Sequence, residues 1–303
     1  MSVVQTGAKA PKENGSAAEA PRPEGPTRQA INMYLRNISG MVGLVLLLLI
    51  VFMTVAGPWL YPVDPFDMAY MPFAEPGEAG APPLGTDSLG RDMLAGIIQG
   101  GQATLAVGAS AALITVIIGV TIGAFAGFYG RWVDDFLMRV TELFQVLPPL
   151  ILAMVIVALF TPSLATIAIA IGVVSWPPVA RLARAEYLRL KELEYVKSAR
   201  VIGARNRRII WRVILPNAAP PLIVSATLTV GIAILFEAGL SFLGLGDPNV
   251  MSWGLIIGNN RDYVLDAWWP VTLPGIAIFL TVLAISLIGD GLNDALNPRL
   301  RER

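Results

Sequence analysis

Cysteine and histidine are both absent from this sequence of 303 residues. Without cysteine there can be no disulfide and no thiolate ligand, and without histidine the common zinc sites and haem ligation through histidine are excluded. The same absences exclude Ser-His and Cys-His nucleophilic pairs. The pattern G-x-x-x-x-G-K followed by Ser or Thr does not occur either, so the chain lacks a phosphate-cradling P-loop. Any ATP that drives this protein must therefore be bound by another polypeptide.

Charged residues are scarce, at 15% of the chain, whereas hydrophobic residues make up 55% and the mean hydropathy is +0.63. Soluble domains average about 25% charged residues, so this composition indicates a membrane protein. The net charge is zero, and the positive charge is confined to short loops instead of one exposed face. A nucleic-acid partner is therefore not expected. We also expect no catalytic residue, no metal site and no cofactor bound by this chain.

The N-terminal region, residues 1–34, is rich in Ala, Pro, Gly, Glu and Lys. Such a composition buries too little apolar surface to offset the entropy of ordering, so we predict a disordered tail. A cleaved signal peptide would have its apolar stretch close behind a basic start, but here the first apolar run begins only near Ile38.

Long apolar segments predict the fold class. A bilayer core of about 30 Å needs roughly 20 apolar residues per helix, and six segments qualify. They run from Ile38 to Gly57, about Ala103 to Phe128, about Val140 to Phe160, Leu164 to Val179, Pro221 to Leu243 and Trp269 to Leu292. Pro58 is expected to end the first of them, and Pro177 with Pro178 to break the fourth. The prediction is an all-α polytopic membrane protein with six transmembrane helices.

The distribution of Lys and Arg predicts the orientation, because positively charged loops stay on the cytoplasmic side. With the N-terminus inside, only Arg91 and Arg261 of the 22 basic residues fall in outer segments. Both termini are therefore expected in the cytoplasm of a bacterial inner-membrane protein. The longest inner segment, residues 181–217, is also the most basic.

Residues 35–101 are expected to contain the first span, a periplasmic segment and an interfacial helix that Asp87 or Ser88 caps. That helix could equally be an ordinary amphipathic connector. The remainder, residues 102–303, would form a core of five spans. Its prolines are expected around a central passage, since they free backbone groups that lipid cannot satisfy. They are Pro148, Pro149, Pro177, Pro178, Pro220, Pro221 and Pro274. Gly119, Gly123 and Gly127, four residues apart, indicate close helix packing.

Within the basic segment, Leu193, Val196, Ala199 and Gly203 recur at helical spacing. They predict a short helix that Gly203 ends in the left-handed conformation, followed by a second helical run, Arg208 to Leu215. The result would be a rigid projection suited to docking in the groove of a partner. A simpler interpretation is that the basic residues only retain the loop inside and contact anionic headgroups.

This segment resembles the EAA motif of ABC-importer permeases, E-A-A-x-x-x-G-x9-I-x-L-P. Ala199, Gly203, Leu215 and Pro216 match the motif, whereas Lys197 stands in place of its Glu and Ser198 in place of an Ala. In that family the motif forms the helix that seats on the ATP-hydrolysing subunit. The resemblance thus implies ATPase coupling by Glu194, Lys197, Ser198, Ala199, Gly203, Ala204, Leu215 and Pro216.

Three other stretches are similar to the second permease subunit of dipeptide, oligopeptide and nickel importers. They are PLGTDSLGRDMLAGIIQGGQATLAVG from residue 83, EAGLSFLGLG from residue 237 and GDGLNDALNPRL from residue 289. The resemblance implies the type I importer permease fold and import of di- or oligopeptides, with nickel chelates, opines or oligosaccharides as alternatives. It implies four kinds of partner: a homologous permease, two cytoplasmic ATPases that hold ATP and Mg, a periplasmic or lipid-anchored binding protein, and membrane lipid.

Glu237 is the single carboxylate well inside a predicted span, and a charge there is costly. Glu237, Ser241 and Phe242 are therefore candidates for an outer gate, although Glu237 could instead lock helix packing. Two rival functions remain. The GLGD sequence ending at Asp247 has the form seen in intramembrane aspartyl proteases, but its second acid, Asp290, would lie at the other membrane face. An ion channel would need more pore charge than Glu237.

Overall fold

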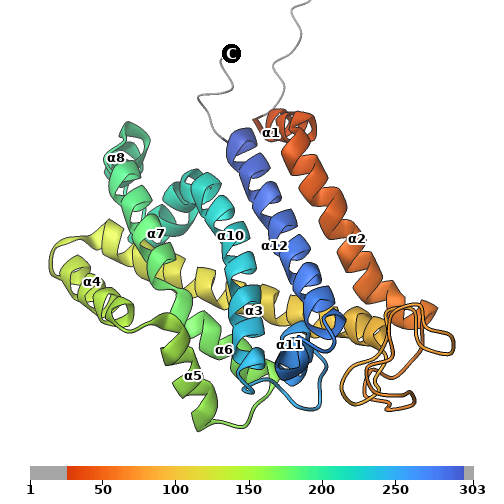
Figure 1. Cartoon of the computed structure of the whole chain (residues 1–303). Helices are drawn as coiled ribbons and strands as arrows, with labels where there is room; N and C mark the ends of the chain where they lie inside the picture. Colours follow the sequence, from red (N-terminus) through yellow and green to blue (C-terminus); the bar gives the residue numbers. More distant parts are fainter. Residues whose placement is uncertain (1–25, 297–303) are drawn as a thin grey trace, which may run out of the picture.

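The computed structural model describes residues 26–296, which form helices joined by loops (Figure 1). Its helices in chain order are α1 (Pro26–Arg36), α2 (Ile38–Leu60), α3 (Met93–Tyr129), α4 (Arg131–Val146), α5 (Pro149–Leu159), α6 (Leu164–Ser175), α7 (Pro177–Leu190), α8 (Glu194–Val201), α9 (Asn206–Arg208), the π-helix η1 (Ile209–Ile214), α10 (Leu215–Phe242), α11 (Trp253–Asn260), the 3-10 helix η2 (Arg261–Tyr263) and α12 (Trp269–Leu296). Within this range no β-strand occurs, apart from an isolated bridge between Thr86 and Asp92. The predicted all-α class is confirmed.

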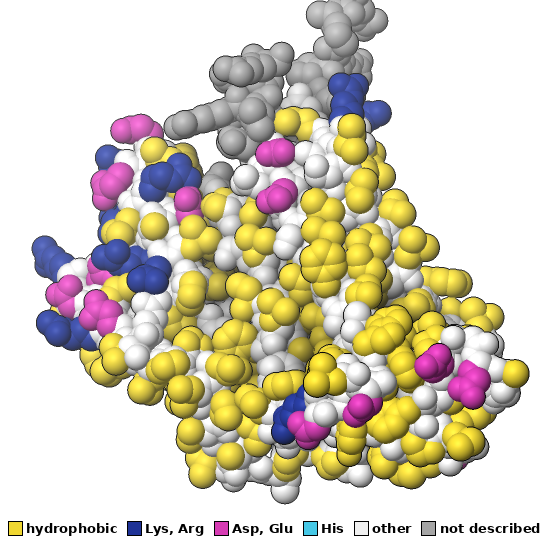
Figure 2. All heavy atoms as spheres, viewed as in Figure 1, with side chains coloured by type: hydrophobic (Ala, Val, Ile, Leu, Met, Phe, Trp, Pro, Cys, Tyr) yellow, Lys and Arg dark blue, Asp and Glu magenta, His cyan; other side chains and the backbone are white. Residues whose placement is uncertain are grey.

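Four helical stretches are long and apolar enough to cross a membrane: α2, α3, the continuous run Asn206–Phe242, and α12. Two helix pairs meet the same criteria when taken together but are bent, α4 with α5 by 86° and α6 with α7 by 46°. Counting each bent pair as one span gives up to six, as the sequence predicts. Figure 2 shows apolar side chains over the middle of the molecule. Helix α2 is among the helices with exposed apolar residues, which include Leu48, Leu49 and Phe52.

Helix α3 packs against α2, α6, α7 and α10 and so forms the centre of the described fold. Its predicted glycine stripe lies directly against α7: Gly119 faces Val179, Gly123 faces Ala180 and Ala183, and Gly127 faces Tyr187. A Cβ atom added at Gly123 would lie 2.6 Å from the Cβ atom of Ala183, with the backbone oxygen of Ala180 closer still. The prediction of close helix packing is confirmed.

The other long helices pair in the same way. Helix α2 lies along α12, where a Cβ atom at Gly43 would stand 2.6 Å from the backbone oxygen of Ala284. Helix α12 also packs on α10, and the short α11 wedges between them. Without water to drive apolar groups together inside a bilayer, such small-residue contacts supply much of the attraction between helices.

The predictions near the N-terminus need two corrections. Residues 26–34 were expected in a disordered tail, but they belong to α1; residues 1–25 lie outside the described range. Pro58 does not end the first span, because α2 continues to Leu60 with Pro58 inside it. The missing N–H of Pro58 costs one hydrogen bond so close to the helix end that the last turn survives.

The interfacial helix predicted before the second span does not exist as a separate element. Residues from Met93 onward are the first turns of α3, whose N-cap is Asp92, accepting from the N–H groups of Leu94 and Ala95. Asp87 and Ser88 precede that cap in a loop, so neither caps the helix. The prediction followed the amphipathic pattern but missed that helical propensity continues unbroken into the apolar segment.

The third span was predicted as one helix from Val140 to Phe160, and this is wrong. Helix α4 begins at Arg131 and ends at Val146, and α5 departs from it at 86°. Two consecutive prolines, Pro148 and Pro149, impose the break, since a residue before proline avoids the helical region. The predicted break of the fourth span is confirmed at Pro177.

We expect Gly123→Ala to destabilise the fold. The added methyl group overpacks the contact with α7, which typically costs about 1–3 kcal/mol. Gly275→Ala is the matched control, because a Cβ atom at Gly275 meets nothing within 4 Å although the residue also lies in a long helix. Thermal melting of the detergent-purified protein should show a lower midpoint for Gly123→Ala alone. Equal midpoints would contradict the proposed contact.

Candidate functional site

Helix α8 is the short helix that the sequence predicts in the basic segment. Leu193 is its N-cap residue, and the helix ends at Val201. Gly203 follows with φ +82°, and the N–H of Ala204 donates to the carbonyl oxygen of Ala199 at 3.0 Å. This six-residue closure with glycine in the left-handed region is a common way to end a helix. The predicted role of Gly203 in stopping α8 is confirmed.

One face of α8 is exposed. Glu194, Lys197, Ser198 and Val201 recur at helical spacing along it, and all four are exposed. Lys197 comes no closer than 3.9 Å to the carboxylate of Glu192, so it is held only loosely. At the tip, Val201 is 87% exposed and Ile202 is 83% exposed. An apolar tip beside a polar face is typical of a surface that binds another protein.

The opposite face of α8 is fixed to the helical core. Val196 is fully buried among Tyr187, Ile209 and Ile210. The hydroxyl group of Tyr187 donates to the carbonyl oxygen of Ile210 at 3.1 Å, which ties α7 to η1. Ala199 and Ala204 are half-buried. The helix is thus a firm projection and not a free loop.

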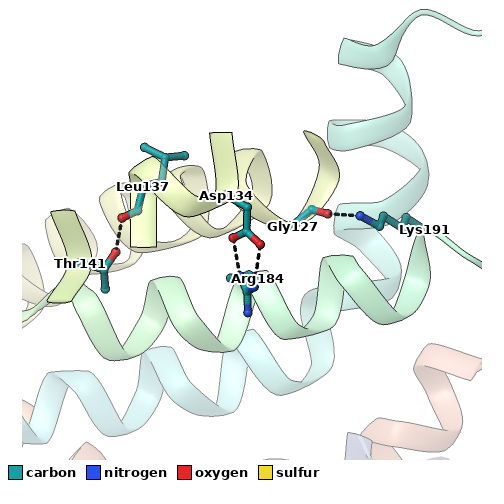
Figure 3. A network of polar contacts seen from close by, with 6 residues as sticks. All are labelled: Gly127, Asp134, Leu137, Thr141, Arg184 and Lys191. Atoms are coloured by element: carbon teal, nitrogen blue, oxygen red, sulfur yellow. Dashed lines mark hydrogen bonds and ion pairs between the residues drawn. The ribbon is translucent and has the colours of Figure 1, made fainter. Parts of the chain in front are cut away.

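A polar network fixes the base of this projection to α3 and α4 (Figure 3). Arg184 of α7 donates to both carboxylate oxygens of Asp134 in α4, at 2.5 and 2.6 Å. The ammonium group of Lys191 donates to the carbonyl oxygen of Gly127, the last glycine of the stripe, at 2.8 Å. A two-point arginine–carboxylate pair fixes relative orientation as well as distance. Helix α7, from which the chain leads into α8, is thus held against α3 and α4.

The second helical run after Gly203 is present, but it does not form a unit separate from the next span. Helix α9, η1 and α10 follow one another as a continuous helical run, with Leu215 half-buried and Pro216 exposed at the start of α10. Pro216, Pro220 and Pro221 cannot donate hydrogen bonds, so the carbonyls four residues earlier lose helical partners. A π-helical segment at such a position is typical of a strained or functional helix.

A cavity of about 640 Å³ lies where the two bent helix pairs meet α10. Pro149, Pro177 and Pro178, three of the seven prolines expected around a central passage, line it. Its polar lining includes Gln145, Ser175, Arg181, Ser225 and Thr229. The hydroxyl oxygen of Ser175 is buried and has no hydrogen-bond partner among residues 26–296. The sequence indicated the prolines but not the polar residues, because these come from four separate helices, α4, α6, α7 and α10.

The three gate candidates do not share one environment, and Glu237 and Ser241 are buried away from any surface. Glu237 is fully buried, and its carboxyl group accepts from the hydroxyl of Ser241 at 2.8 Å. The hydroxyl groups of Thr104 in α3 and Ser252 at the start of α11 lie beside it. Both accept backbone N–H groups, from Trp253 and Leu255, and the Oε2 atom of Glu237 has no hydrogen-bond partner among residues 26–296.

In this conformation Glu237 therefore lies buried where α10 packs on α3 and α11, which favours the packing alternative raised by its sequence context. Phe242 differs, because it is partly exposed at the end of α10 and its ring lies under the guanidinium group of Arg261, 5.2 Å from the ring centroid.

The long segment between α2 and α3 is held by several tertiary contacts. The hydroxyl of Tyr61 donates to Asp92 at 2.5 Å, and burial together with this carboxylate raises the pKa of Tyr61, so it stays protonated. Trp269 donates to the carbonyl oxygen of Thr86 at 2.9 Å, and the N–H of Ser88 donates to Asn260 at 3.0 Å. Figure 2 shows few Lys or Arg at this end of the molecule, whereas they gather at the end that carries α4 and α8.

The protease alternative finds no support in the geometry. Asp247 follows the end of α10, whereas Asp290 lies near the far end of α12, which runs in the opposite direction (Figure 1). Two carboxylates must be close enough to share a proton in an aspartyl protease. Among residues 26–296, no cluster of three or more acidic side chains could hold a metal ion.

Comparison with known proteins agrees with this geometry. Residues 119–302 match the family model of the binding-protein-dependent transport system inner membrane component. The chain belongs to this family. Residues 25–83 match a second model, the N-terminal TM domain of oligopeptide transport permease C. The protein is therefore a non-catalytic, multi-pass inner-membrane permease subunit of an ABC importer. Such importers include ATPase and substrate-binding components.

Individual relatives cover nearly the whole chain. The di/tripeptide transport system permease protein DppC of Pseudomonas aeruginosa is 41% identical over 283 residues, which are 91% of this chain and 93% of the relative. The dipeptide transport system permease protein DppC of Alkalihalophilus pseudofirmus is 38% identical, with 91% of each chain covered. A glutathione transport system permease protein of Pectobacterium atrosepticum is 36% identical, with 91% and 92% covered.

Among solved structures, an inward-facing form of the MetNI methionine ABC transporter contains a chain with the same fold. The TM-score is 0.57 at 20% identity, and the match covers 68% of this chain and 98% of the other. This likeness confirms the predicted type I importer permease fold.

We expect Glu237→Ala to lower stability by about 1–3 kcal/mol, because the buried hydroxyl group of Ser241 loses its acceptor. Glu142→Ala is a suitable control, since Glu142 is an exposed carboxylate and such changes usually stay within about 0.5 kcal/mol. Thermal melting in detergent measures both. An unchanged midpoint for Glu237→Ala would show that the carboxyl group does not lock α11, and would return Glu237 to the gate candidates.

Proposed function

We propose that this chain forms half of the translocation pathway of an ATP-driven importer of di- or oligopeptides. The observation that carries the proposal is α8, a fixed projection with an exposed face and apolar tip, in a chain of this family. The names of its relatives support peptides as substrate. A glutathione permease among them is consistent with this class, since glutathione is itself a small peptide.

Coupling runs from the ATPases to the membrane through α8. A cytoplasmic ATPase contacts the exposed face formed by Glu194, Lys197, Ser198 and Val201, together with Ile202 at the tip. Closure of the ATPases around ATP and Mg displaces α8. The remaining predicted coupling residues, Ala199, Gly203, Ala204, Leu215 and Pro216, shape the projection and its continuation into α10. Because Tyr187 ties α7 to η1, on which α8 packs, the displacement tilts the bent α6–α7 pair. Docking of the ATPases can shift the permease between two conformations only if the ATPases bind these conformations with different affinity.

The cavity at the helix breaks supplies this chain's part of the passage. An extended peptide carries backbone N–H and C=O groups that need partners inside the membrane. Gln145, Ser175, Ser225 and Thr229 offer such partners on an otherwise apolar wall. A homologous permease subunit would contribute the other wall.

The outer loops between Tyr61 and Gln102 and between Leu243 and Trp268 receive the substrate-binding protein, which is periplasmic or lipid-anchored. Acidic residues are exposed there, among them Asp64, Asp67 and Asp262. The distribution of Lys and Arg supports this orientation, with both termini in the cytoplasm.

Orientation can be tested directly because the chain has no native cysteine. In the variant Ile202→Cys, we expect the introduced cysteine to react with a membrane-impermeant maleimide only after permeabilisation of the cell. Leu265 is 98% exposed at the other end of the molecule. In the variant Leu265→Cys, the introduced cysteine should react in whole cells once the reagent reaches the periplasm. The reverse pattern would contradict the proposed topology and the role of α8.

Function is tested by reconstituting the complete transporter with its ATPases and binding protein and measuring ATP-dependent uptake of a labelled tripeptide. We expect Gly203→Val to leave membrane insertion intact but to reduce uptake per ATP hydrolysed by roughly tenfold, within the usual range of coupling energies. The reason is that valine strains a backbone with φ +82°.

Gly80→Val is the matched control, since Gly80 has φ +88° and open space around it but lies in the outer segment. Normal uptake by Gly203→Val would contradict the proposed coupling through α8. Uptake of a nickel chelate, an opine or an oligosaccharide in place of peptide would instead overturn only the substrate.

A further inference from the structure

A basic hollow of about 490 Å³ lies beside α8, at the start of the helix that continues into α10. Four arginines and one tryptophan line it: Arg205, Arg207, Arg208, Trp211 and Arg212. None of the four guanidinium groups forms an ion pair or a hydrogen bond within the described part of the chain. All four arginines are exposed, and because like charges repel one another, an anion bound among them would be stabilised.

An apolar hollow of about 760 Å³ adjoins the basic one. It lies between the end of α3 and the start of α4, and its lining includes Ile122, Phe125, Tyr129 and Phe136. The ring of Phe125 contacts the ring of Trp211 edge-on, with centroids 6.5 Å apart, and stacks on Tyr129 at 6.0 Å. A continuous row of aromatic rings therefore connects the arginine cluster to an open apolar surface.

We propose that these two hollows together bind one anionic phospholipid. The phosphate group occupies the arginine cluster, since the planar guanidinium fork matches phosphate oxygens in two-point contacts. An acyl chain lies in the apolar hollow across the rings of Phe125 and Tyr129. Trp211 stands at the junction between headgroup and chain, which is where indole side chains are enriched in membrane proteins.

This site differs from the surface assigned to the ATPases. The exposed face of α8 uses Glu194, Lys197, Ser198 and Val201, and none of these lines either hollow. Acidic side chains of a partner could neutralise the arginines, but they would leave the adjoining apolar hollow unfilled. A bound lipid satisfies both halves. It would also brace η1, the segment through which α8 continues into the membrane, and it does so whatever solute is transported.

The test compares lipid retention by the complete detergent-purified transporter, measured by native mass spectrometry during titration with dioleoyl phosphatidylglycerol or dioleoyl phosphatidylcholine. We expect retention of phosphatidylglycerol and not of phosphatidylcholine. The double change Arg207→Gln with Arg212→Gln should weaken retention roughly 25-fold, because each basic residue near a membrane surface contributes a factor of about five.

The matched control is Arg36→Gln with Arg139→Gln, which removes two exposed arginines that line neither hollow. It should retain phosphatidylglycerol as the unaltered transporter does. A second variant, Ile122→Trp, keeps every arginine but fills the apolar hollow, and it too should weaken retention.

Four results would overturn the proposal. They are equal retention by the two double variants, undiminished retention by Ile122→Trp, displacement of the lipid by glycerol 3-phosphate at equal concentration, and loss of the ATPases from the Arg207→Gln, Arg212→Gln complex with lipid retention unchanged. The third would show a site for a free phosphate, and the fourth a site for acidic side chains of the ATPase.

Discussion

Close approach of the α3 and α7 backbones is the constraint on which the functional end of this protein depends. Glycines 119, 123 and 127 leave no side chain between the two helices, so Ala180 and Ala183 can touch the α3 backbone. Contact at this range supplies dispersion energy that lipid cannot match, and any added methyl group opens the interface. Because α8 follows directly from α7, the orientation of the proposed coupling projection is determined by that contact.

Prolines have the opposite effect at the middle of the fold, because they break helices instead of bringing them together. They separate α4 from α5 and α6 from α7, and the two bends meet against α10 around the polar cavity. Backbone groups released by a helix break cannot face hydrocarbon, so the breaks must turn toward protein or a wet space. A chain built only of straight spans would pack more tightly but would offer a peptide no internal polar surface. The glycine contacts thus give a tightly packed α3–α7 interface, whereas the proline breaks leave a polar cavity.

Local chemistry explains which sequence predictions succeeded. The end of α8 at Gly203 could be predicted because the left-handed conformation depends on the backbone angles of a single residue. It can be inferred without knowing which residues pack nearby. The prediction of one span from Val140 to Phe160 was wrong because mean hydropathy carries no information on the direction of a helix. It therefore could not indicate the 86° bend, although Pro148 and Pro149 lie at the break. The separate helix expected near Ser88 failed for a related reason. A cap at Asp92 competes with caps a few residues earlier, and packing of the first turns of α3 against α11 favours the later one.

The sequence alone determined the membrane class, the apolar segments, the uneven placement of Lys and Arg, and the resemblance that indicated an importer subunit. Each depends on composition, on residues near one another in the chain, or on a motif. Tertiary structure decided that Glu237 lies buried beside Thr104 and Ser252, that polar residues of four helices share one cavity, and that Trp211 contacts Phe125. These contacts join residues far apart in sequence, and their energies depend on distances that only the packed helices define.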